Sequence, residues 1–340
     1  MKKGFVLVLY LISVFSLFSC SNRSDVMSFT AMNTYMTIKS YGSRSPKANK
    51  AVQDEVNRLE KIISTTITDS DVYIINNCEK ESFEKKDLHP ETVYLLNASK
   101  EYYGMTDKAF NPCLYPVIKE WGFTTGDYKV PSKNRIEELL RNTDFNKINM
   151  NDIQLQKQKG MQIDFGAVGK GYAGDRATAI LKKYGIKSAL LDFGGNIQTL
   201  GAKPDGNLWT VAVKNPFDSR PACSIKIKDK CVITSGGYER FFIGDDGKKY
   251  IHIFDGKTGY PVQNDLESVT IICNEGIYGD ALSTSLFVMG KDKAIDFYKN
   301  KLDFDFVLIT KDRSLIYSEG LAPVLTVIGQ FDSVLTIQSK

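Results

Sequence analysis

Apolar residues follow a helical spacing in the first half of the chain. Between Pro46 and Ile63 they recur every three or four positions, which predicts an amphipathic helix. The same spacing predicts further helices over Glu91–Tyr103, Lys133–Arg141 and Tyr172–Tyr184. One segment ahead of them, Phe29–Tyr41, alternates with a period of two and predicts a strand.

From Ile186 onward the pattern changes to short strands separated by Gly, Asn and Asp turns. The expected strands are Ser188–Phe193, Trp209–Lys214, Ser224–Lys228, Tyr250–Phe254 and Ser268–Cys273, with a helical stretch over Lys293–Asn300 near the end. Helices followed by hairpins predict an α+β fold with a mostly antiparallel sheet and flanking helices. Since no linker composition is visible, residues 29–340 are expected to form a single domain.

The stretch GIYGDALSTSLFVMG, residues 276–290, carries the strongest chemical signal. Its apolar residues recur at helical spacing, which predicts a helix that begins at Asp280. Thr284 lies four residues further on and shares a face with Asp280, with Ser283 beside them. A carboxylate and hydroxyls are hard oxygen ligands suited to Mg²⁺. The alternative is that Asp280 only complements the dipole at the helix N-terminus.

A second motif, GKGYAG over Gly169–Gly174, has the G-x-G-x-x-G form and follows an expected strand over Met161–Phe165. With a helix and a strand ending at Asp192 behind it, this unit matches a dinucleotide-binding fingerprint. We disfavour that interpretation because no run of further βαβ units follows. A glycine-rich turn that approaches a phosphate, and a turn without a ligand, both remain open.

The first 19 residues have the pattern of a secretory signal. Lys2 and Lys3 precede an apolar run from Phe5 to Leu17 that is too short to span a bilayer. Cys20 follows at the cleavage position, as in a bacterial lipobox. We therefore expect a lipoprotein signal peptide over 1–19, a lipidated tether over 20–28, and an exported protein anchored to a membrane and facing the periplasm.

Charge and cysteine content exclude several function classes. The net charge of +4 falls to +2 without Lys2 and Lys3, and no basic run is present, so nucleic acid is not an expected partner. The spacing of the later cysteines gives neither a disulfide framework nor a zinc motif, and most are expected to be small buried residues. These are Cys78, Cys113, Cys223, Cys231 and Cys273.

Seven segments, in order, resemble the ApbE family of FAD:protein FMN transferases. They are FTAMNTYMTI (29–38), KAFNPCLYPVIKEWGF (108–123), IDFGAVGKGYAGD (163–175), FGGNI (193–197), TSGGYERFF (234–242), HIFDGKTGYPV (252–262) and GDALSTSLFVMG (279–290). Each is a weak signal alone, but seven in one order identify the chain as a member of this family.

The resemblance implies site residues and a reaction. Mg²⁺ would be bound by Asp280, Thr284, the backbone carbonyl of Ala167, and Ser283. The FAD site would be lined by Met32, Ala109, Phe110, Asn111, Asp164, Lys170 and Phe254. In the implied reaction a threonine hydroxyl of a partner protein attacks the FMN phosphorus of FAD, AMP leaves, and FMN stays attached through a phosphoester. Mg²⁺ would bridge the pyrophosphate oxygens, and Lys170 would add positive charge.

The implied partner is an acceptor protein with a threonine motif resembling D/S-G-x-x-S/T-A-T. Subunits of flavin-dependent redox pumps, such as the Na⁺-translocating NADH:quinone reductase or the Rnf type, would carry it. Two other functions remain open: a Mg-dependent FAD pyrophosphatase that releases FMN and AMP, and a non-enzymatic lipoprotein that binds FAD.

His252, one of two histidines, lies in a family motif. With Asp280 it is a candidate catalytic residue, as a base near the acceptor hydroxyl, although it could equally tie down the turn over 255–258. Tyr238 and Arg240 are expected to share a strand face and to stabilise the sheet rather than hold phosphate.

Five positions depart from the family pattern, all on the expected flavin side. Asn33 and Lys108 stand where the family has Gly, Asn111 where it has Asp, and Gly256 where it has Pro. Thr66 takes the place of an aromatic that would cover the flavin ring. The expected metal ligands are unchanged.

Overall fold

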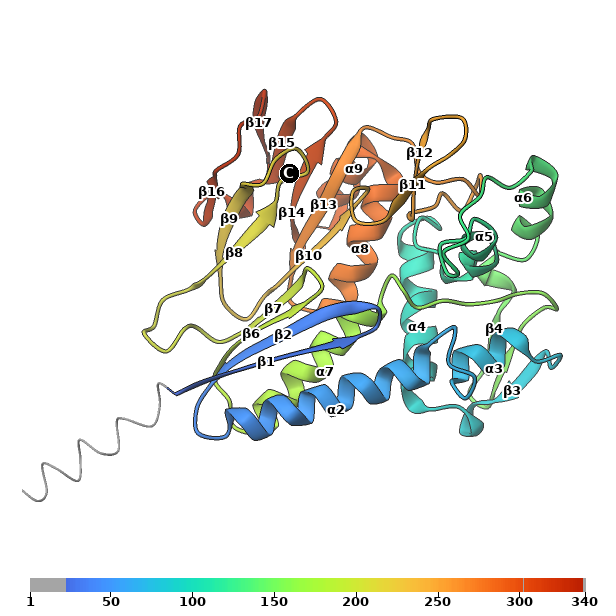
Figure 1. Ribbon diagram of the computed structural model, residues 1–340, viewed down its shortest axis with the longest axis horizontal. Helices are drawn as coiled ribbons and strands as arrows, with labels where there is room; N and C mark the ends of the chain where they lie inside the picture. The colour runs from blue at the N-terminus through green and yellow to red at the C-terminus, as the bar shows by residue number, and fades with distance from the viewer. Residues whose placement is uncertain (1–22, 302, 339–340) are drawn as a thin grey trace, which may run out of the picture.

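A nine-stranded sheet runs through the protein, whose computed structural model describes residues 23–301 and 303–338 (Figure 1). In spatial order its strands are β1 (Ser24–Ala31), β2 (Thr34–Tyr41), β6 (Ser188–Phe193), β7 (Asn196–Leu200), β10 (Cys231–Gly236), β13 (Leu266–Cys273), β14 (Asp305–Thr310), β15 (Ser314–Ser318) and β17 (Ser333–Ile337). Neighbouring strands are antiparallel except for β15 and β17. The predicted α+β class with a mostly antiparallel sheet is confirmed.

The middle of this sheet is covered on both faces. Val269 and Ile271 of β13 pack in one core with α8 (Gly276–Met289) and α9 (Lys291–Lys301), whereas Ile272 packs in another. That second core also holds residues of a three-stranded sheet, β16 (Leu325–Val327), β9 (Pro221–Ile227) and β8 (Trp209–Lys214). Because successive side chains point to opposite faces, burial on both sides explains the nearly continuous apolar run of β13.

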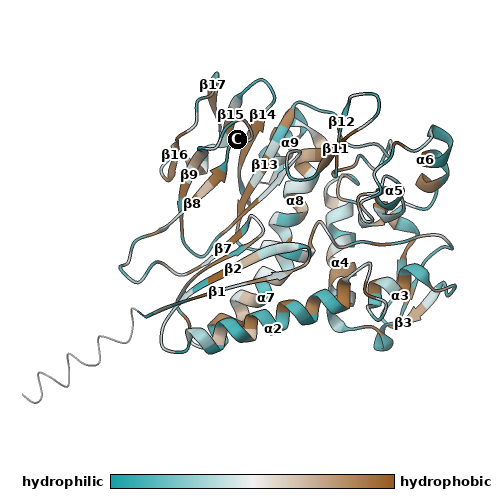
Figure 2. Cartoon of the chain, in the orientation of Figure 1, coloured by the Kyte–Doolittle hydropathy of each residue, from teal (hydrophilic) through white to brown (hydrophobic). Residues whose placement is uncertain are grey.

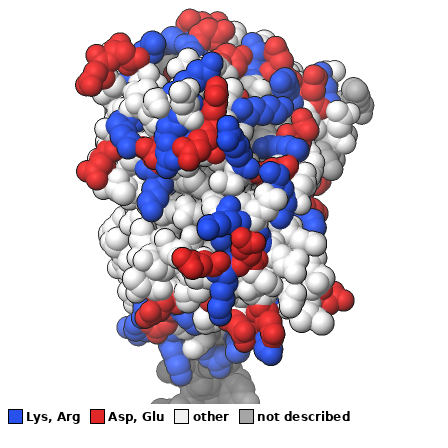
Figure 3. All heavy atoms as spheres, turned by 90° about the vertical axis from the view of Figure 1, so that its right-hand side faces the viewer, with Lys and Arg blue, Asp and Glu red and all other residues white. Residues whose placement is uncertain are grey.

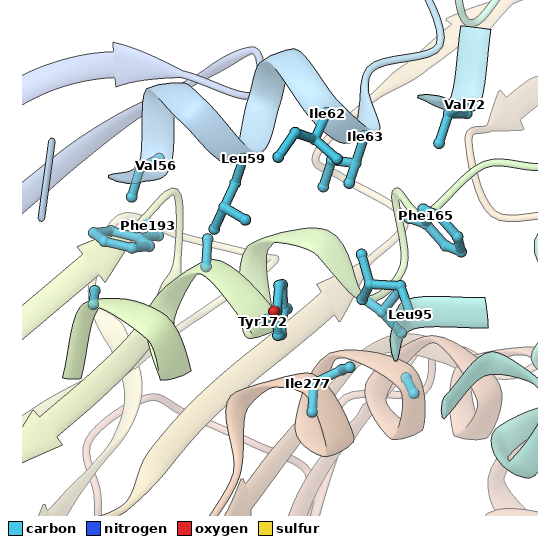
Figure 4. Close-up of a cluster of buried hydrophobic side chains, with 14 of the residues drawn as sticks. Val56, Leu59, Ile62, Ile63, Val72, Leu95, Phe165, Tyr172, Phe193 and Ile277 are labelled. Carbon is cyan, nitrogen blue, oxygen red and sulfur yellow. The ribbon is translucent and has the colours of Figure 1, made fainter. Parts of the chain in front are cut away.

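Two helices, α2 (Ser45–Ile63) and α7 (Gly169–Lys183), cover the β1–β2–β6 end of the sheet, and α4 (Pro90–Met105) packs in the same core beside α2. Figure 4 shows Val56 and Leu59 of α2 directed toward Phe193 of β6 and the α7 helix. Hydrophilic and hydrophobic bands alternate along α2 in Figure 2, as its helical spacing predicted. The expected amphipathic helix therefore forms and buries its apolar face.

The first expected strand is in fact a hairpin. Met32 and Asn33 have φ values of 50° and 56°, so the left-handed pair makes a two-residue turn that joins β1 to β2. β1 begins at Ser24, so residues 24–28, expected in the tether, belong to the sheet. Their polar composition misled, because an edge strand needs only backbone pairing, and Asp25 further accepts a hydrogen bond from Asn49 at 2.8 Å.

Met161–Phe165 does not form a strand. Its alternating apolar residues are buried, but the amide of Asn76 takes the place of a neighbouring strand. Ile163 donates its N–H to Asn76 Oδ1 at 2.7 Å, and Asn76 Nδ2 donates to the Ile163 carbonyl at 2.8 Å. Burial alone produces the alternation, so the strand–turn–helix unit of the dinucleotide interpretation is absent from this segment.

Several shorter elements lie on the right-hand side of the molecule in Figure 1. They are α3 (Asp71–Asn77), α5 (Tyr115–Glu120), α6 (Lys133–Leu140), the pair β11 (Phe241–Ile243) and β12 (Lys249–Ile251), the small sheet β3 (Ser82–Glu84), β5 (Gln154–Gln156) and β4 (Asn149–Met150), and the 3-10 turns η1 (Lys85–Asp87), η2 (Pro112–Leu114) and η3 (Phe145–Lys147). One more 3-10 turn, η4 (Glu319–Leu321), lies beside β14. The strand expected to reach Phe254 ends at Ile251, because Phe254 turns to bridge Pro261 and packs against Trp121 and Phe123.

The surface on the right-hand side of Figure 1 carries both positive and negative side chains. Figure 3 shows Lys and Arg side chains interspersed with Asp and Glu across the face that it presents. No helix within residues 23–301 and 303–338 combines the length and apolar character needed to cross a bilayer. The expected signal peptide and the lipidation site Cys20 lie outside the described residues.

Candidate active site

Helices α7 and α8 cross with backbone against backbone. A Cβ on Gly171 of α7 would overlap the carbonyl oxygen of Gly276 and lie 2.8 Å from Cβ of Asp280. Glycine is therefore required at this crossing, because any side chain would force the helices apart. The close approach places the first turn of α7 directly against Asp280.

Helix α8 begins at Gly276, four residues before the predicted start. Asp175 of α7 caps it, accepting hydrogen bonds from the N–H groups of Gly276 at 2.7 Å and Ile277 at 2.8 Å. Burial raises the pKa of Asp175 to about 6, although the two N–H groups favour its charged form. Since the cap comes from another helix, the local sequence could not reveal it. The dipole interpretation proposed for Asp280 applies instead to Asp175.

Asp280 is a buried carboxylate with a fixed orientation. Its side chain accepts a hydrogen bond from the Gly171 N–H at Oδ2 (2.9 Å) and from Asn196 Nδ2 at Oδ1 (3.0 Å), and only 4% of the residue is exposed. Because Gly171 lies in the first turn of α7, its N–H is one of those that a helix leaves for a partner outside the helix. Asn196 Oδ1, although buried, has no hydrogen-bond partner within the described part of the chain.

Three hydroxyl groups gather one turn further along α8. Ser235 Oγ lies 2.9 Å from Ser283 Oγ and 3.2 Å from Thr284 Oγ1. Ser283 also donates to the backbone carbonyl of Asp280 at 3.0 Å. The structure thus brings together Asp280, Ser283 and Thr284, as predicted. Ser235 was missed, although it lies in the TSGG segment at the end of β10.

These oxygens are chemically suited to a hard divalent cation. Within residues 23–301 and 303–338 no three Asp, Glu, His or Cys side chains form a metal-binding group. A cation here would instead use one carboxylate and hydroxyls, and the Ala167 carbonyl stays a predicted further ligand. Mg²⁺ tolerates such a set, since it often keeps water and substrate phosphate oxygens as its other ligands. The unpartnered Asn196 Oδ1 next to Asp280 adds a further oxygen acceptor.

His252 is held in one tautomer near two cations. Its Nδ1 lies 3.1 Å from the backbone carbonyl of Arg240, which can only accept, so Nδ1 carries the proton and Nε2 has a free lone pair. Burial, together with the charges of Arg240 and Lys170, lowers the pKa of His252 to about 4. The imidazole is therefore neutral at pH 7. Both open interpretations of His252 survive, because it anchors a loop and keeps a basic nitrogen.

Contrary to the sequence expectation, Tyr238 does not lie on a strand, and neither does Arg240. Arg240 occupies the turn between β10 and β11, where its guanidinium donates to the backbone carbonyl of Phe123. Its charge acts on His252 and also on Asp164, which lies in the loop before α7. Burial raises the pKa of Asp164, whereas the Gly166 N–H and Arg240 oppose the shift. Lys170, His252, Arg240 and Asp164 thus form one polar cluster.

The residues expected to line the flavin site lie in different environments and do not form one group in the structure. Phe110 is 1% and Phe254 4% exposed, and both rings pack in aromatic contacts, so only their backbones can meet a ligand. Met32 lies on the hairpin turn and donates its N–H to Glu60 of α2 at 2.9 Å. Ala109 is half-buried in the loop after α4. No hydrogen bond or ring contact of the described residues links Met32 to the polar cluster.

Three departures from the family pattern acquire a structural explanation. Asn33 and Lys108, in place of family glycines, have φ values of 56° and 68°, so both positions retain the left-handed backbone that glycine favours. Asn111 accepts from the Cys113 N–H at 2.9 Å and donates Nδ2 to the Thr143 carbonyl at 3.0 Å. An ionised aspartate could not make the second bond. Its side chain therefore stabilises the loop.

Thr66 is exposed at the edge of the same region. Its N–H donates to Ser64 Oγ at 3.1 Å, and the neighbouring Thr65 hydroxyl bonds to Tyr115. Burial raises the pKa of Tyr115, to which the charge of Asp164 contributes. The loop of Thr66 is thus tied to the polar cluster through Tyr115.

Comparisons with known proteins agree with this fold. The protein named FAD:protein FMN transferase in Klebsiella pneumoniae is 32% identical over 307 residues, covering 87% of this chain and 92% of its own length. The protein of the same name in Treponema pallidum is 30% identical, covering 91% and 92%. A crystal structure of the ApbE protein of Thermotoga maritima superimposes with a TM-score of 0.83 at 31% identity, over 89% of this chain and 99% of that one.

The family assignment rests on a match that spans most of the sequence. The description of the ApbE family fits residues 32–308, from the β1–β2 turn to β14. The flavinyl transferase ApbE of Pseudomonas stutzeri, in its apo form, superimposes with a TM-score of 0.77 at 26% identity, over 86% of this chain and 92% of that one. The resemblance read from the seven sequence segments is confirmed, and this chain belongs to the ApbE family.

Proposed function

We propose that this protein is a Mg²⁺-dependent FAD:protein FMN transferase that attaches FMN to a threonine of an acceptor protein. The observation that carries the proposal is the buried Asp280 carboxylate, fixed by Gly171 and Asn196 beside the hydroxyls of Ser283 and Thr284. A fixed carboxylate with hard oxygen neighbours suits a metal–pyrophosphate complex. Family membership and the names of the relatives support the coarser part of the proposal, the transfer of FMN from FAD to a protein.

When bound, Mg²⁺ would neutralise charge on the pyrophosphate of FAD; Asp280, Ser283, Thr284 and the Ala167 carbonyl would hold it. Lys170 would place a further positive charge near the same phosphates. The remaining contribution of the chain is positioning, as in other phosphoryl transfers.

The proton of the attacking hydroxyl needs an acceptor, and His252 is the proposed base. Its Nδ1–H is bound to the Arg240 carbonyl, which leaves Nε2 as the basic nitrogen. In the step, the threonine oxygen forms a bond to the FMN phosphorus, the pyrophosphate P–O bond breaks, and AMP leaves with the electron pair. The threonine proton passes to Nε2.

The decisive experiment is intact-mass analysis of an acceptor after incubation with this protein, FAD and Mg²⁺. Candidate acceptors are subunits of redox pumps of the Na⁺-translocating NADH:quinone reductase or Rnf type. We expect one FMN moiety to be added, and the acceptor with its threonine changed to valine to stay unmodified. AMP release without any acceptor modification would instead favour the pyrophosphatase, and FAD binding without AMP release the storage protein.

We also propose that the protein is exported and anchored to a membrane, facing the periplasm, through lipidated Cys20. This rests on the apolar run before Cys20 in the sequence. Membrane fractionation of the wild type and Cys20→Ala tests it, with Cys78→Ala as the control. A wild-type protein found fully in the soluble fraction, with Cys20 unmodified, would contradict the proposal.

A further inference from the structure

Two cysteines that are far apart in the sequence lie directly opposite each other in the central sheet. Cys231, the first residue of β10, pairs with Cys273, the last residue of β13, in the antiparallel ladder. Directly opposed residues place their side chains on the same face, with Cα atoms about 4.5–5.5 Å apart. Disulfide-bonded cysteines span about 4.4–6.8 Å between Cα atoms, so the backbone needs no rearrangement to accept a bond.

Both thiols are buried in the same hydrophobic core. Cys231 is 3% and Cys273 1% exposed, and both belong to the core beneath α8. The Cys231 thiol interacts with that of Cys273, and this contact, together with burial, raises its pKa. Reaction of the folded dithiol is therefore slow, which favours oxidation while the strands are assembling.

We propose that Cys231 and Cys273 form a cross-strand disulfide when the protein folds in contact with a disulfide oxidant. The bond would close a loop of the chain that contains both Arg240 and His252. It would also lie under the start of the metal-binding segment, since a Cβ on Gly279 would be 2.8 Å from Cys273 Sγ. The cross-link would thus join the two ends of the loop that carries Arg240 and His252 of the polar cluster, at the base of the Asp280 helix.

The step needs an external disulfide, such as oxidised glutathione or a protein disulfide oxidant. The thiolate of one cysteine attacks that disulfide, forms a mixed disulfide and releases one reduced thiol. The second cysteine then attacks the mixed disulfide, so the protein gains an S–S bond and a second reduced thiol leaves. Two thiol protons of the protein end on the two released thiols, and the oxidant takes up two electrons.

The other described cysteines serve as internal controls. Cys223 of β9 faces Val213 on β8 and Val327 on β16, so it has no cysteine opposite it. Cys113 is buried in a different core, in the loop region of η2. Either residue can therefore be replaced without removing the proposed bond.

Refolding of the reduced, denatured protein provides the test. We expect refolding in a mixture of oxidised and reduced glutathione to hide two thiols from N-ethylmaleimide added after denaturation, and proteolytic mapping to recover a peptide pair linked through Cys231 and Cys273. Refolding with reduced glutathione alone should leave both thiols free. Cys223→Ala should keep the linked pair, whereas Cys231→Ala and Cys273→Ala should each abolish it.

The thermal midpoint gives a second readout. Closing a loop of this length restricts the unfolded chain, so the oxidised protein should melt about 5 °C or more above the reduced form. Full labelling of both thiols after oxidative refolding, or a link between other cysteines, would overturn the proposal. The wild-type peptide map decides the matter even if a cysteine variant does not fold.

Discussion

The metal end and the flavin end of the candidate site are built in different ways. At the metal end, Asp280 projects from a buried helix whose backbone touches that of α7, and both of its carboxylate oxygens accept hydrogen bonds. At the flavin end, Asn33, Lys108 and Thr66 lie on exposed turns and loops. All of the departures from the family pattern fall at the second end.

The difference shows what each kind of structure allows to vary. In a packed helix crossing, the identity of the side chain and the position of the backbone are inseparable, because even one methyl group would overlap a neighbour. In the turns, the backbone conformation is retained while the residue changes: Asn33 and Lys108 keep the left-handed φ of a glycine. Loops could therefore vary the proposed flavin contacts without disturbing the proposed metal ligands.

The strongest way to break this comparison is to remove the carboxylate. We expect Asp280→Ala to lower AMP release from FAD roughly a thousandfold, because it takes away the charged ligand at the pyrophosphate. AMP release is measured in trace-metal-free buffer with added Mg²⁺, and Asp292→Ala, exposed on α9, is the control.

The exchange Asp280→Asn with Asn196→Asp keeps the pair of hydrogen-bonding groups but moves the charge, so it should remain inactive. Full activity of Asp280→Ala would show that this end holds no metal.

His252→Gln tests whether His252, in the polar cluster, acts as a base or only anchors its loop. A glutamine can still donate to the Arg240 carbonyl but cannot take up a proton, so FMN transfer should fall by about 10²–10⁴-fold at pH 7.5. His89→Gln, at the start of α4, should leave transfer near the wild-type rate. A wild-type rate for His252→Gln would assign His252 to loop anchoring alone.

The same variant changes the response of stability to pH. His252 has a pKa of about 4 in the folded protein, against 6.5 as its ordinary value. Its stabilising contribution is therefore fully present above about pH 6.5 and is lost as the pH falls toward 4, where the unfolded chain binds the extra proton. Urea unfolding between pH 4 and 7 should show a flatter profile for His252→Gln.

Gly171→Ala separates packing from chemistry at the metal end. The added methyl group would overlap the Gly276 carbonyl, so we expect a loss of about 3 kcal/mol in the free energy of unfolding. Gly104→Ala in α4 is the matched control, because its Cβ would meet nothing within 4 Å, and it should gain about 0.5–1 kcal/mol. Equal stabilities of the two variants in urea would disprove the tight helix crossing.

Thr66→Tyr sharpens the comparison at the flavin end. An aromatic ring stacked on the flavin contributes about 0.5–1.5 kcal/mol, so FAD should bind up to about tenfold more tightly, with unchanged Mg²⁺ dependence. Calorimetry measures the affinity, and Thr68→Tyr, exposed in the same loop, is the control. If the affinity is unaltered or weaker, position 66 does not contact the flavin.

The smallest expected effect concerns Lys108. Replacing it with glycine relieves a left-handed backbone, and after the entropy cost of glycine the protein should gain about 0.5–1 kcal/mol. Asn33→Gly should change the free energy of unfolding less, since asparagine tolerates this conformation better. Urea unfolding of both variants tests the order, and a destabilised Lys108→Gly would mean that the lysine side chain itself stabilises the loop.

Sequence periodicity correctly predicted the helices and strands whose structure depends only on their own pattern of apolar residues. The apolar stripe of α2 and the strands Ser188–Phe193 and Trp209–Lys214 form as expected. It failed where a partner distant in the sequence decides the structure. Asn76 replaces a strand beside Ile163, and Asp175 sets the start of α8. Asp280, Ser283 and Thr284 could be grouped because they share one helix, whereas Ser235 joins them only through the fold.

The glycines of the GKGYAG segment have a meaning beyond the single crossing at Gly171. A Cβ on Gly169 would press against Ile63 of α2 at 3.2 Å, and one on Gly174 would overlap the amide of Gln198 on β7. The three glycines thus face three different neighbours of α7: α2, α8 and the sheet. The spacing of the glycines therefore reflects which sides of α7 pack closely against a neighbouring element. The glycines of this segment thus follow from the packing of α7, and they do not indicate the Rossmann fold whose sequence pattern they match.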